Sequence, residues 1–209
     1  MKNNILIKEL CVDSTEQAVN AEKNGADRIE LCKSLDLEGL TPEINVIQKT
    51  IESVDIPVKV MIRPKAGNFI YSHNEIKLME SDIELCKKLN VTEVVFGVLN
   101  STGNIDIEKI ERLASIAYPM TITFHKAIDQ TEEMFNELDR LSTIQGVSSI
   151  LTSGGEETAI KGQTRLKNII DRYGKRFNII VAGSITHENF DKIHGLINAR
   201  EYHGKNLIA

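Results

Sequence analysis

The chain has 209 residues, of which 41% are hydrophobic and 26% charged, an ordinary globular composition without a low-complexity or disordered segment. No stretch resembles a linker, so we expect one domain over residues 1–209. The net charge is −5 and the 25 Lys and Arg residues are scattered rather than gathered in a stripe, which argues against a nucleic-acid partner.

The start of the chain and its cysteines bear on location. The first apolar run is too short for a signal peptide, and no stretch of about 18 apolar residues follows, so neither secretion nor a membrane partner is expected. Cys11, Cys32 and Cys86 are an odd number without paired spacing, which indicates free thiols rather than a disulfide framework. The predicted location is the cytoplasm.

Eight short apolar or β-branched runs alternate with helical patterns along the chain. They cover residues 5–11, 27–32, 58–62, 94–98, 121–125, 148–152, 178–182 and 199–203. This alternation predicts parallel strands joined by crossover helices, and we expect an α/β protein with a TIM-type (β/α)₈ barrel. An open doubly wound sheet is the structural alternative. Its usual nucleotide signatures, G-x-G-x-x-G and G-x-x-x-x-G-K-[ST], are missing, so no nucleotide cofactor is expected.

Helix starts are predicted from capping patterns. The pairs with the spacing of a capping box are Ser14 with Gln17, Ser72 with Glu75 and Asp129 with Glu132, and Thr41-Pro42 has proline at a first helical position. A helix over residues 72–90 has an apolar face that includes Cys86, which we therefore expect in the core.

The last strand is followed only by residues 204–209, so the eighth helix is expected to be short or absent. We expect this gap to leave apolar barrel surface open beside the first and eighth strands. Because large exposed apolar patches usually mark interfaces, a second subunit is expected to cover it, which makes a homo-oligomer.

The carboxyl ends of barrel strands form the working face of such folds. Alternation places Glu9 with Cys11 on one face of the first strand, and Glu30 with Cys32 on one face of the second. The candidate catalytic residues at this mouth are Glu9, Glu30, Arg63, His125 and His203. Arg63 is the expected partner of the carboxylates or of an anionic ligand.

Each residue also has a structural interpretation. The Glu and Arg side chains are compatible with structural ion pairs, and His125 with a hydrogen-bonded strand-end histidine, although its titration near neutral pH suits acid–base work. Cys11 and Cys32 are compatible with small buried apolar side chains.

Two glycine turns follow the sixth and seventh strands. They place Thr152, Ser153 and Gly154 on one side and Gly183 and Ser184 on the other as candidate ligand-binding residues. Barrel phosphate sites commonly use loops at this position, but glycine turns are also ordinary connections.

Several motifs spread along the chain resemble the CutC copper homeostasis family. They lie at residues 9–14, 24–32, 39–42, 61–64, 97–99, 123–129, 151–154 and 201–203. The resemblance implies a TIM-type barrel, a cytoplasmic location, copper handling and homo-oligomers. Cys11 and Cys32 match positions where family members carry cysteines suspected of binding Cu(I). Residues 65–68, Lys-Ala-Gly-Asn, depart from the usual Arg-Gly-Gly-Asp stretch, and the C-terminal region is short.

Two functions are therefore weighed. The first is a Cu(I)-binding homeostasis protein with Cys11 and Cys32 as soft thiolate ligands. The second is an enzyme acting on a small anionic metabolite such as a sugar phosphate, with Glu9 or Glu30 as base, His125 as acid or electrophile and Arg63 as anion clamp.

Overall fold

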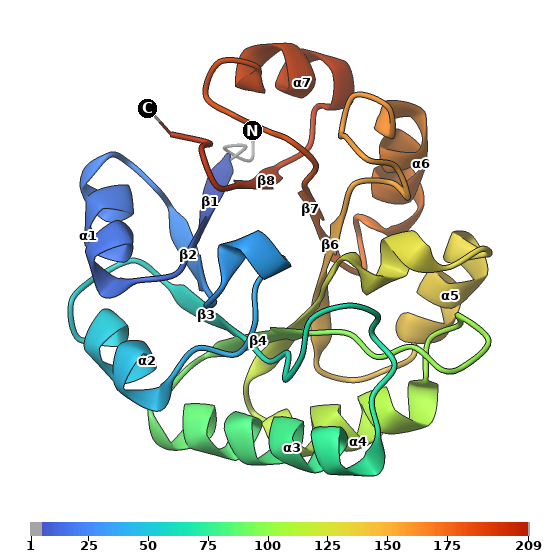
Figure 1. Ribbon diagram of the computed structural model, residues 1–209. Coiled ribbons are helices and arrows are strands. Elements are labelled where there is room, and N and C mark those ends of the chain that lie inside the picture. The colour runs from blue at the N-terminus through green and yellow to red at the C-terminus, as the bar shows by residue number, and fades with distance from the viewer. Residues whose placement is uncertain (1–5, 209) are drawn as a thin grey trace.

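The computed structural model describes residues 6–208 and shows a closed barrel of eight parallel strands that stand in chain order (Figure 1). The strands are β1 (Ile7–Val12), β2 (Arg28–Leu31), β3 (Val58–Met61), β4 (Glu93–Phe96), β5 (Thr121–Phe124), β6 (Val147–Thr152), β7 (Asn178–Val181) and β8 (Glu201–Gly204). The barrel closes where β1 pairs with β8. The predicted (β/α)₈ barrel is confirmed, and the open doubly wound sheet is excluded.

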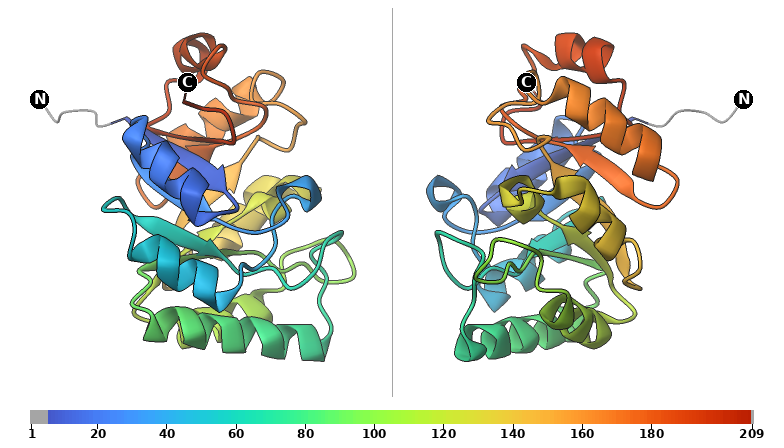
Figure 2. Two further views of the ribbon diagram at one scale, coloured as in Figure 1. Left: turned by 60° about the vertical axis from the view of Figure 1, so that its left-hand side comes forward. Right: turned by 90° about the vertical axis from the view of Figure 1, so that its right-hand side faces the viewer.

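Seven α-helices in the described part of the chain surround the strands (Figures 1 and 2). They are α1 (Thr15–Lys23), α2 (Ile44–Ile51), α3 (His73–Lys88), α4 (Ile107–Ala117), α5 (Met134–Leu141), α6 (Gln163–Tyr173) and α7 (Phe190–Ile197). Two 3₁₀ helices, η1 (Leu35–Leu37) and η2 (Lys126–Gln130), lie in the loops after β2 and β5. No helix follows β8 up to residue 208, as predicted, and none within 6–208 is long and apolar enough to span a membrane.

Helix α3 forms as its sequence predicts. Ser72 accepts the backbone N–H of Glu75, and the Glu75 carboxylate accepts the backbone N–H of Ser72, which completes a capping box. The apolar face of the helix, including Cys86, is buried against the barrel. Ser14 caps α1 by accepting the N–H of Gln17, although the Gln17 side chain bonds to Asp13 instead of Ser14.

Two predicted helix starts are wrong because their capping side chains serve other contacts. The Thr41 hydroxyl accepts the backbone N–H of Arg63, and α2 begins only at Ile44. Asp129 lies inside η2, its carboxylate accepts N–H groups from the loop after β6, and α5 begins at Met134. In both cases a long-range hydrogen bond replaces the local cap.

The expected open apolar surface beside β1 and β8 is absent from residues 6–208. Leu10 on β1 is 8% exposed and Tyr202 on β8 is fully buried, where it packs edge-on against Phe190 of α7. The exposed large apolar side chains lie elsewhere: Leu37, Ile44, Leu78, Leu85 and Tyr118. The argument for a homo-oligomer from this patch is therefore wrong, and the homo-oligomer itself stays a prediction.

A buried ammonium group sits in the barrel interior. Lys59 of β3 is 1% exposed, and its Nζ lies 3.3 Å from a Glu9 carboxylate oxygen and 2.9 Å from one of Glu93. It also donates a hydrogen bond of 2.9 Å to the hydroxyl of Thr123. These partners come from β1, β4 and β5, so one cation links four strands across the barrel.

Replacing this cation tests its importance for stability. Lys59→Met is expected to lower the free energy of unfolding by about 3–5 kcal/mol, because the buried Glu9 carboxylate and the partly exposed Glu93 carboxylate lose a shared cation. Urea unfolding measures the loss. The control is Lys161→Met, which breaks an exposed pair with Glu157 and is expected to leave the unfolding midpoint unchanged. Equal midpoints for the two variants would contradict the role given to Lys59.

Candidate functional site

A cavity of about 660 Å³ opens at the carboxyl ends of the strands. Four of the five predicted catalytic residues line it, namely Glu30, Arg63, His125 and His203, and Cys11 lines it with them. Strand alternation brings these side chains to one mouth, as the sequence predicts. Glu9 lies one layer deeper and does not line the cavity.

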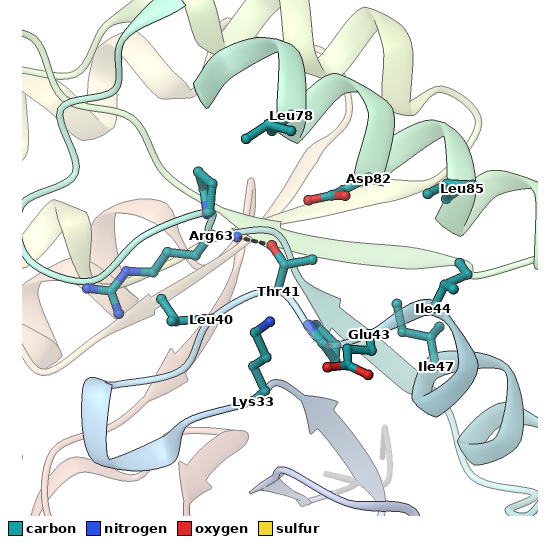
Figure 3. A pocket seen from close by; sticks show the side chains of 12 residues that line it. Lys33, Leu40, Thr41, Glu43, Ile44, Ile47, Arg63, Leu78, Asp82 and Leu85 are labelled. Atoms are coloured by element: carbon teal, nitrogen blue, oxygen red, sulfur yellow. Dashed lines mark hydrogen bonds between the residues drawn. The ribbon is translucent and has the colours of Figure 1, made fainter. Parts of the chain in front are cut away.

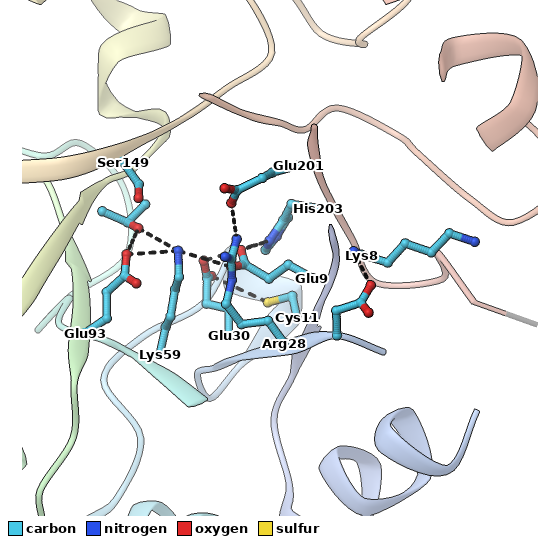
Figure 4. A network of polar contacts seen from close by, with 12 residues as sticks. Lys8, Glu9, Cys11, Arg28, Glu30, Lys59, Glu93, Ser149, Glu201 and His203 are labelled. Atoms are coloured by element: carbon cyan, nitrogen blue, oxygen red, sulfur yellow. Dashed lines mark hydrogen bonds and ion pairs between the residues drawn. The ribbon is translucent and has the colours of Figure 1, made fainter. Parts of the chain in front are cut away.

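Glu9 is fully buried within an ion network (Figure 4). Its carboxylate accepts a hydrogen bond from Arg28 and lies 2.8 Å from Nδ1 of His203 and 3.3 Å from Nζ of Lys59. Arg28 also bonds to Glu201 at 2.6 Å. Burial alone would raise the pKa of Glu9, but Lys59, Arg28 and His203 together hold it well below its ordinary value. Glu9 is thus a fixed carboxylate that anchors His203.

Glu30 is nearly as buried but has fewer cations near it: one of its carboxylate oxygens lies 3.9 Å from Nδ1 of His203. One carboxylate oxygen lies 3.7 Å from the sulfur of Cys11, and the other has no hydrogen-bond partner within the described chain. Burial raises the pKa of Glu30; His203 opposes the shift and the nearby Glu9 charge adds to it. The two carboxylates therefore differ in protonation: Glu9 stays ionised, whereas Glu30 holds a proton more readily.

The two histidines that line the cavity have pKa values shifted in opposite directions. For His203, burial would lower the pKa, but the carboxylates of Glu30 and Glu9 outweigh it and raise the pKa above its ordinary value. For His125, burial and the charge of Arg63 lower the pKa to about 3. Nδ1 of His125 accepts the N–H of Ala127 at 3.2 Å, so the ring is neutral and its proton sits on Nε2. No residue in 6–208 accepts from that Nε2.

Glycines make room for both the imidazole and the thiols. A Cβ on Gly97 would lie 2.7 Å from Nδ1 of His125, and one on Gly39, whose φ is +84°, would lie 3.2 Å from the sulfur of Cys32. Both glycines belong to motifs that carry the sequence resemblance. The close approach of His125 and Cys32 to the backbone therefore explains why glycine stands at both positions.

Cys11 and Cys32 end adjacent strands, and their sulfurs lie 3.4 Å apart. Both are buried in a small cluster with Met61 and Val95. The hydrogen bond to Cys32, burial and the Glu30 charge raise the pKa of Cys11 well above its ordinary value. Cys11, Glu30 and His203 offer ligand atoms within 4.8 Å of one another. Cys86 is far from them in the core of the α3 face, where burial raises its pKa to about 12.

Arg63 does not pair with Glu9 or Glu30, contrary to expectation; Arg28 and Lys59 take that place. Its guanidinium donates to the carbonyls of Leu37, Glu38 and Gly39 and to that of Gly67, at 3.0 to 3.1 Å. Figure 3 shows the Arg63 side chain pointing away from Asp82 and Ile47 of a smaller groove between α2 and α3, and Arg63 also lines the mouth cavity. Arg63 therefore ties the loops after β2 and β3 together.

The two glycine turns differ in their hydrogen bonding. After β6, the Asp129 carboxylate accepts bonds from the hydroxyls of Thr152 and Ser153 and from two backbone N–H groups, and Gly154 donates to the hydroxyl of Thr152. Those groups are thus occupied within the chain. After β7, Gly183 and Ser184 have φ values of +109° and +55° and line the cavity.

Charged residues of the site that the sequence analysis missed include Arg28, Lys59 and Asp129. Arg28 shares strand parity with Glu30 and Cys32, and Lys59 shares it with Met61, so alternation contained the signal for both. Asp129 had no comparable signal, because its capping-box spacing favoured a local role.

Fold and cavity together define a TIM-barrel protein with a buried thiol pair beside a polar mouth. The CutC family model matches residues 6–208, and the chain belongs to the CutC family. It is 42% identical to the copper homeostasis protein cutC homolog of Homo sapiens, over 96% of this chain and 73% of that protein. It is 39% identical to a CutC family protein of Aliivibrio fischeri, over 93% and 79%. A CutC crystal structure from Streptococcus agalactiae superposes with a TM-score of 0.91 at 30% identity, over 97% of this chain and 100% of that one.

Imidazole NMR tests the assignment of the two histidines. Between about pH 5 and 7, His125 is expected to stay neutral with its proton on Nε2, whereas His203 keeps its second proton above about pH 6.5, the ordinary histidine pKa. A raised folded-state pKa means that the His203 contribution to stability is complete below about pH 6.5 and is lost as the pH rises through the folded value. Histidines that titrate together near pH 6.5 would refute this assignment.

Adding a methyl group beside His125 tests the close approach of Gly97. Gly97→Ala is expected to destabilise the protein by about 1–3 kcal/mol, because the new Cβ overlaps the imidazole. The control is Gly195→Ala in α7, where a Cβ meets nothing within 4 Å and a gain of up to about 1 kcal/mol is expected. Chemical denaturation compares the two, and a neutral Gly97→Ala would show that the ring is free to shift.

Proposed function

We propose that this chain binds Cu(I) in the cytoplasm as part of copper homeostasis, with the thiols of Cys11 and Cys32 as ligands. The observation that carries the proposal is the 3.4 Å separation of the two sulfurs at the carboxyl ends of adjacent strands. Thiolates are soft ligands that suit Cu(I). Free cysteines at all three positions support a reducing compartment.

The separation of the sulfurs favours a bent rather than a linear site. With metal–sulfur bonds of about 2.3 Å, the zinc–thiolate value, a linear unit needs sulfurs about 4.6 Å apart. Cys11 and Cys32 must therefore move apart or bind the ion at an angle, which leaves one side open to a third ligand. His203 and the Met61 thioether are the candidates, because His203 lies in the ligand cluster and Met61 packs beside both thiols.

Copper binding at this site requires the release of protons. The pKa of Cys11 is raised, so its thiol is protonated at neutral pH and must be deprotonated to bind the ion. Glu30, which lies 3.7 Å from the Cys11 sulfur and has a raised pKa, is placed to take that proton. Cu(I) affinity should therefore increase with pH.

An enzyme acting on a small polar or anionic metabolite is the second candidate function. It is favoured by the partnerless Nε2–H of a neutral His125 and the partnerless oxygen of Glu30, both in residues that line the same cavity. In this proposal Glu30 is the base and His125 the electrophile. Glu9 is unsuited to proton transfer because cations hold it ionised.

Competition with a Cu(I) chelator tests the copper site. Cys11→Ser and Cys32→Ser are each expected to weaken Cu(I) binding at least about tenfold, because a hydroxyl is a poor ligand for a soft ion. Cys86→Ser is the control: its thiol lies on the core face of α3, and the affinity should stay unchanged.

Two further readouts complete this test. The wild-type affinity should increase from about pH 6 to pH 8, because fewer protons compete for the thiolates at higher pH. Urea unfolding of each variant shows that a lost site is not a lost fold. Equal Cu(I) affinity in all three cysteine variants would remove this site from the proposal.

A further inference from the structure

The loop after β7 offers backbone donors that the protein itself does not use. The N–H groups of Gly183, Ser184 and Ile185 have no acceptor among residues 6–208, and all three residues line the mouth cavity. The loop after β6 is the internal comparison, since its N–H groups at Ser153 and Gly155 already donate to Asp129. Successive free N–H groups in a turn with left-handed residues form a concave site that suits an anion.

A second, independent observation lies in the same cavity. His125 is 3% exposed, its Nδ1 is committed to Ala127, and its Nε2 has no acceptor in the described chain. A buried donor without a partner costs free energy, which a ligand oxygen at this position recovers. Glu30, 2% exposed, adds an acceptor oxygen that lacks a hydrogen-bond partner and lies 3.9 Å from Nδ1 of His203.

Several charged residues of the lining are engaged elsewhere in the chain. The Lys205 ammonium donates to a carbonyl of η1 at 2.6 Å, and the Glu157 carboxylate pairs with an exposed lysine of its own loop. The carboxylate of Asp129, also in the lining, is satisfied by donors from the β6 loop. The free N–H groups of the β7 loop therefore remain to take an anionic group, with the uncharged part of the ligand toward His125 and Glu30.

We propose that the mouth cavity binds a small polyhydroxylated anion, with its phosphate or carboxylate on the N–H groups of residues 183–185 and its hydroxyl oxygens at His125 and Glu30. A cavity of about 660 Å³ falls in the range of small-molecule sites. This binding does not require copper, because none of the three backbone donors belongs to the thiol cluster. Phosphate and carboxylate share the recognising chemistry, and the probes below separate them.

Isothermal titration calorimetry on the full, copper-free chain tests the proposal with D-ribose 5-phosphate, D-gluconate and D-ribose at up to millimolar concentration. At least one anionic probe is expected to bind at least about tenfold more tightly than ribose, because only the anions engage the loop donors. The stronger of the two anions identifies the preferred head group. If no probe binds, or if ribose binds as tightly as both anions, the proposal is overturned.

A matched pair of variants locates the anion. Ser184→Asp places a carboxylate at the exposed loop and keeps a residue that tolerates its φ of +55°, so affinity should fall at least about tenfold by charge repulsion. Asn90→Asp adds the same charge at another exposed position with a φ of +60°, following α3, and should change affinity less than about twofold. Equal affinities for the two variants would place the anion elsewhere and overturn the assignment.

NMR of His125 separately tests the end of the site where the ligand hydroxyl oxygens are placed. The Nε2–H resonance of His125 should shift when the anionic probe is added to wild type and should stay at its free position in Ser184→Asp. Cys86→Ser, whose thiol lies on the core face of α3 outside the cavity, should keep the anion affinity within about twofold. An unshifted His125 resonance in a saturated wild-type complex would overturn the proposed orientation.

Discussion

The structure depends on how charge is accommodated inside a closed barrel. Isolated ions are costly in such an interior, and this barrel carries Glu9 and Lys59 in its centre with 0% and 1% exposure. They are tolerated because each has partners on other strands: Lys59 contacts Glu9 and Glu93, and Glu9 also contacts Arg28 and His203. The network thus holds β1 against β8 and sets the electrostatic conditions of the cavity above it.

The ion network gives side chains of the same type different pKa values. Glu9 faces three cationic groups and stays ionised, whereas Glu30, one layer nearer the mouth, has no such set and its pKa rises through burial. The carboxylates beside His203 raise its pKa, whereas burial and the nearby Arg63 charge lower the pKa of His125. The mouth therefore combines a fixed neutral donor, a proton-accepting carboxylate and a thiol pair, which explains why both metal and small-molecule binding are chemically reasonable there.

The sequence predicted the barrel because eight apolar runs with alternating polar ends leave few other arrangements for parallel strands. It also placed Glu30, His125, His203 and Cys11 at one mouth, since strand parity determines which side chains face inward. It failed where long-range hydrogen bonds overrode local patterns. Thr41 and Asp129 have the spacing of helix caps, yet each bonds to a strand end or loop more than 20 residues away. The partners of the carboxylates were missed for a related reason: Lys59 stands among valines, and only barrel closure brings it to Glu9.

Arg63 has a consequence for how the cavity rim moves. One guanidinium, stacked 4.9 Å from the ring centre of Phe69, holds carbonyls of both the β2 loop and the β3 loop. Neither loop can swing outward without breaking charge-assisted hydrogen bonds that also secure the other. The two segments are therefore expected to open together as one unit of local unfolding, and the Arg63 side chain contributes to the free energy of that opening. The opposite rim, built on the β7 loop, is linked to this unit by the segment after β8: Asn206 bridges to Thr186, and the Lys205 ammonium donates to the Leu35 carbonyl of the β2 loop.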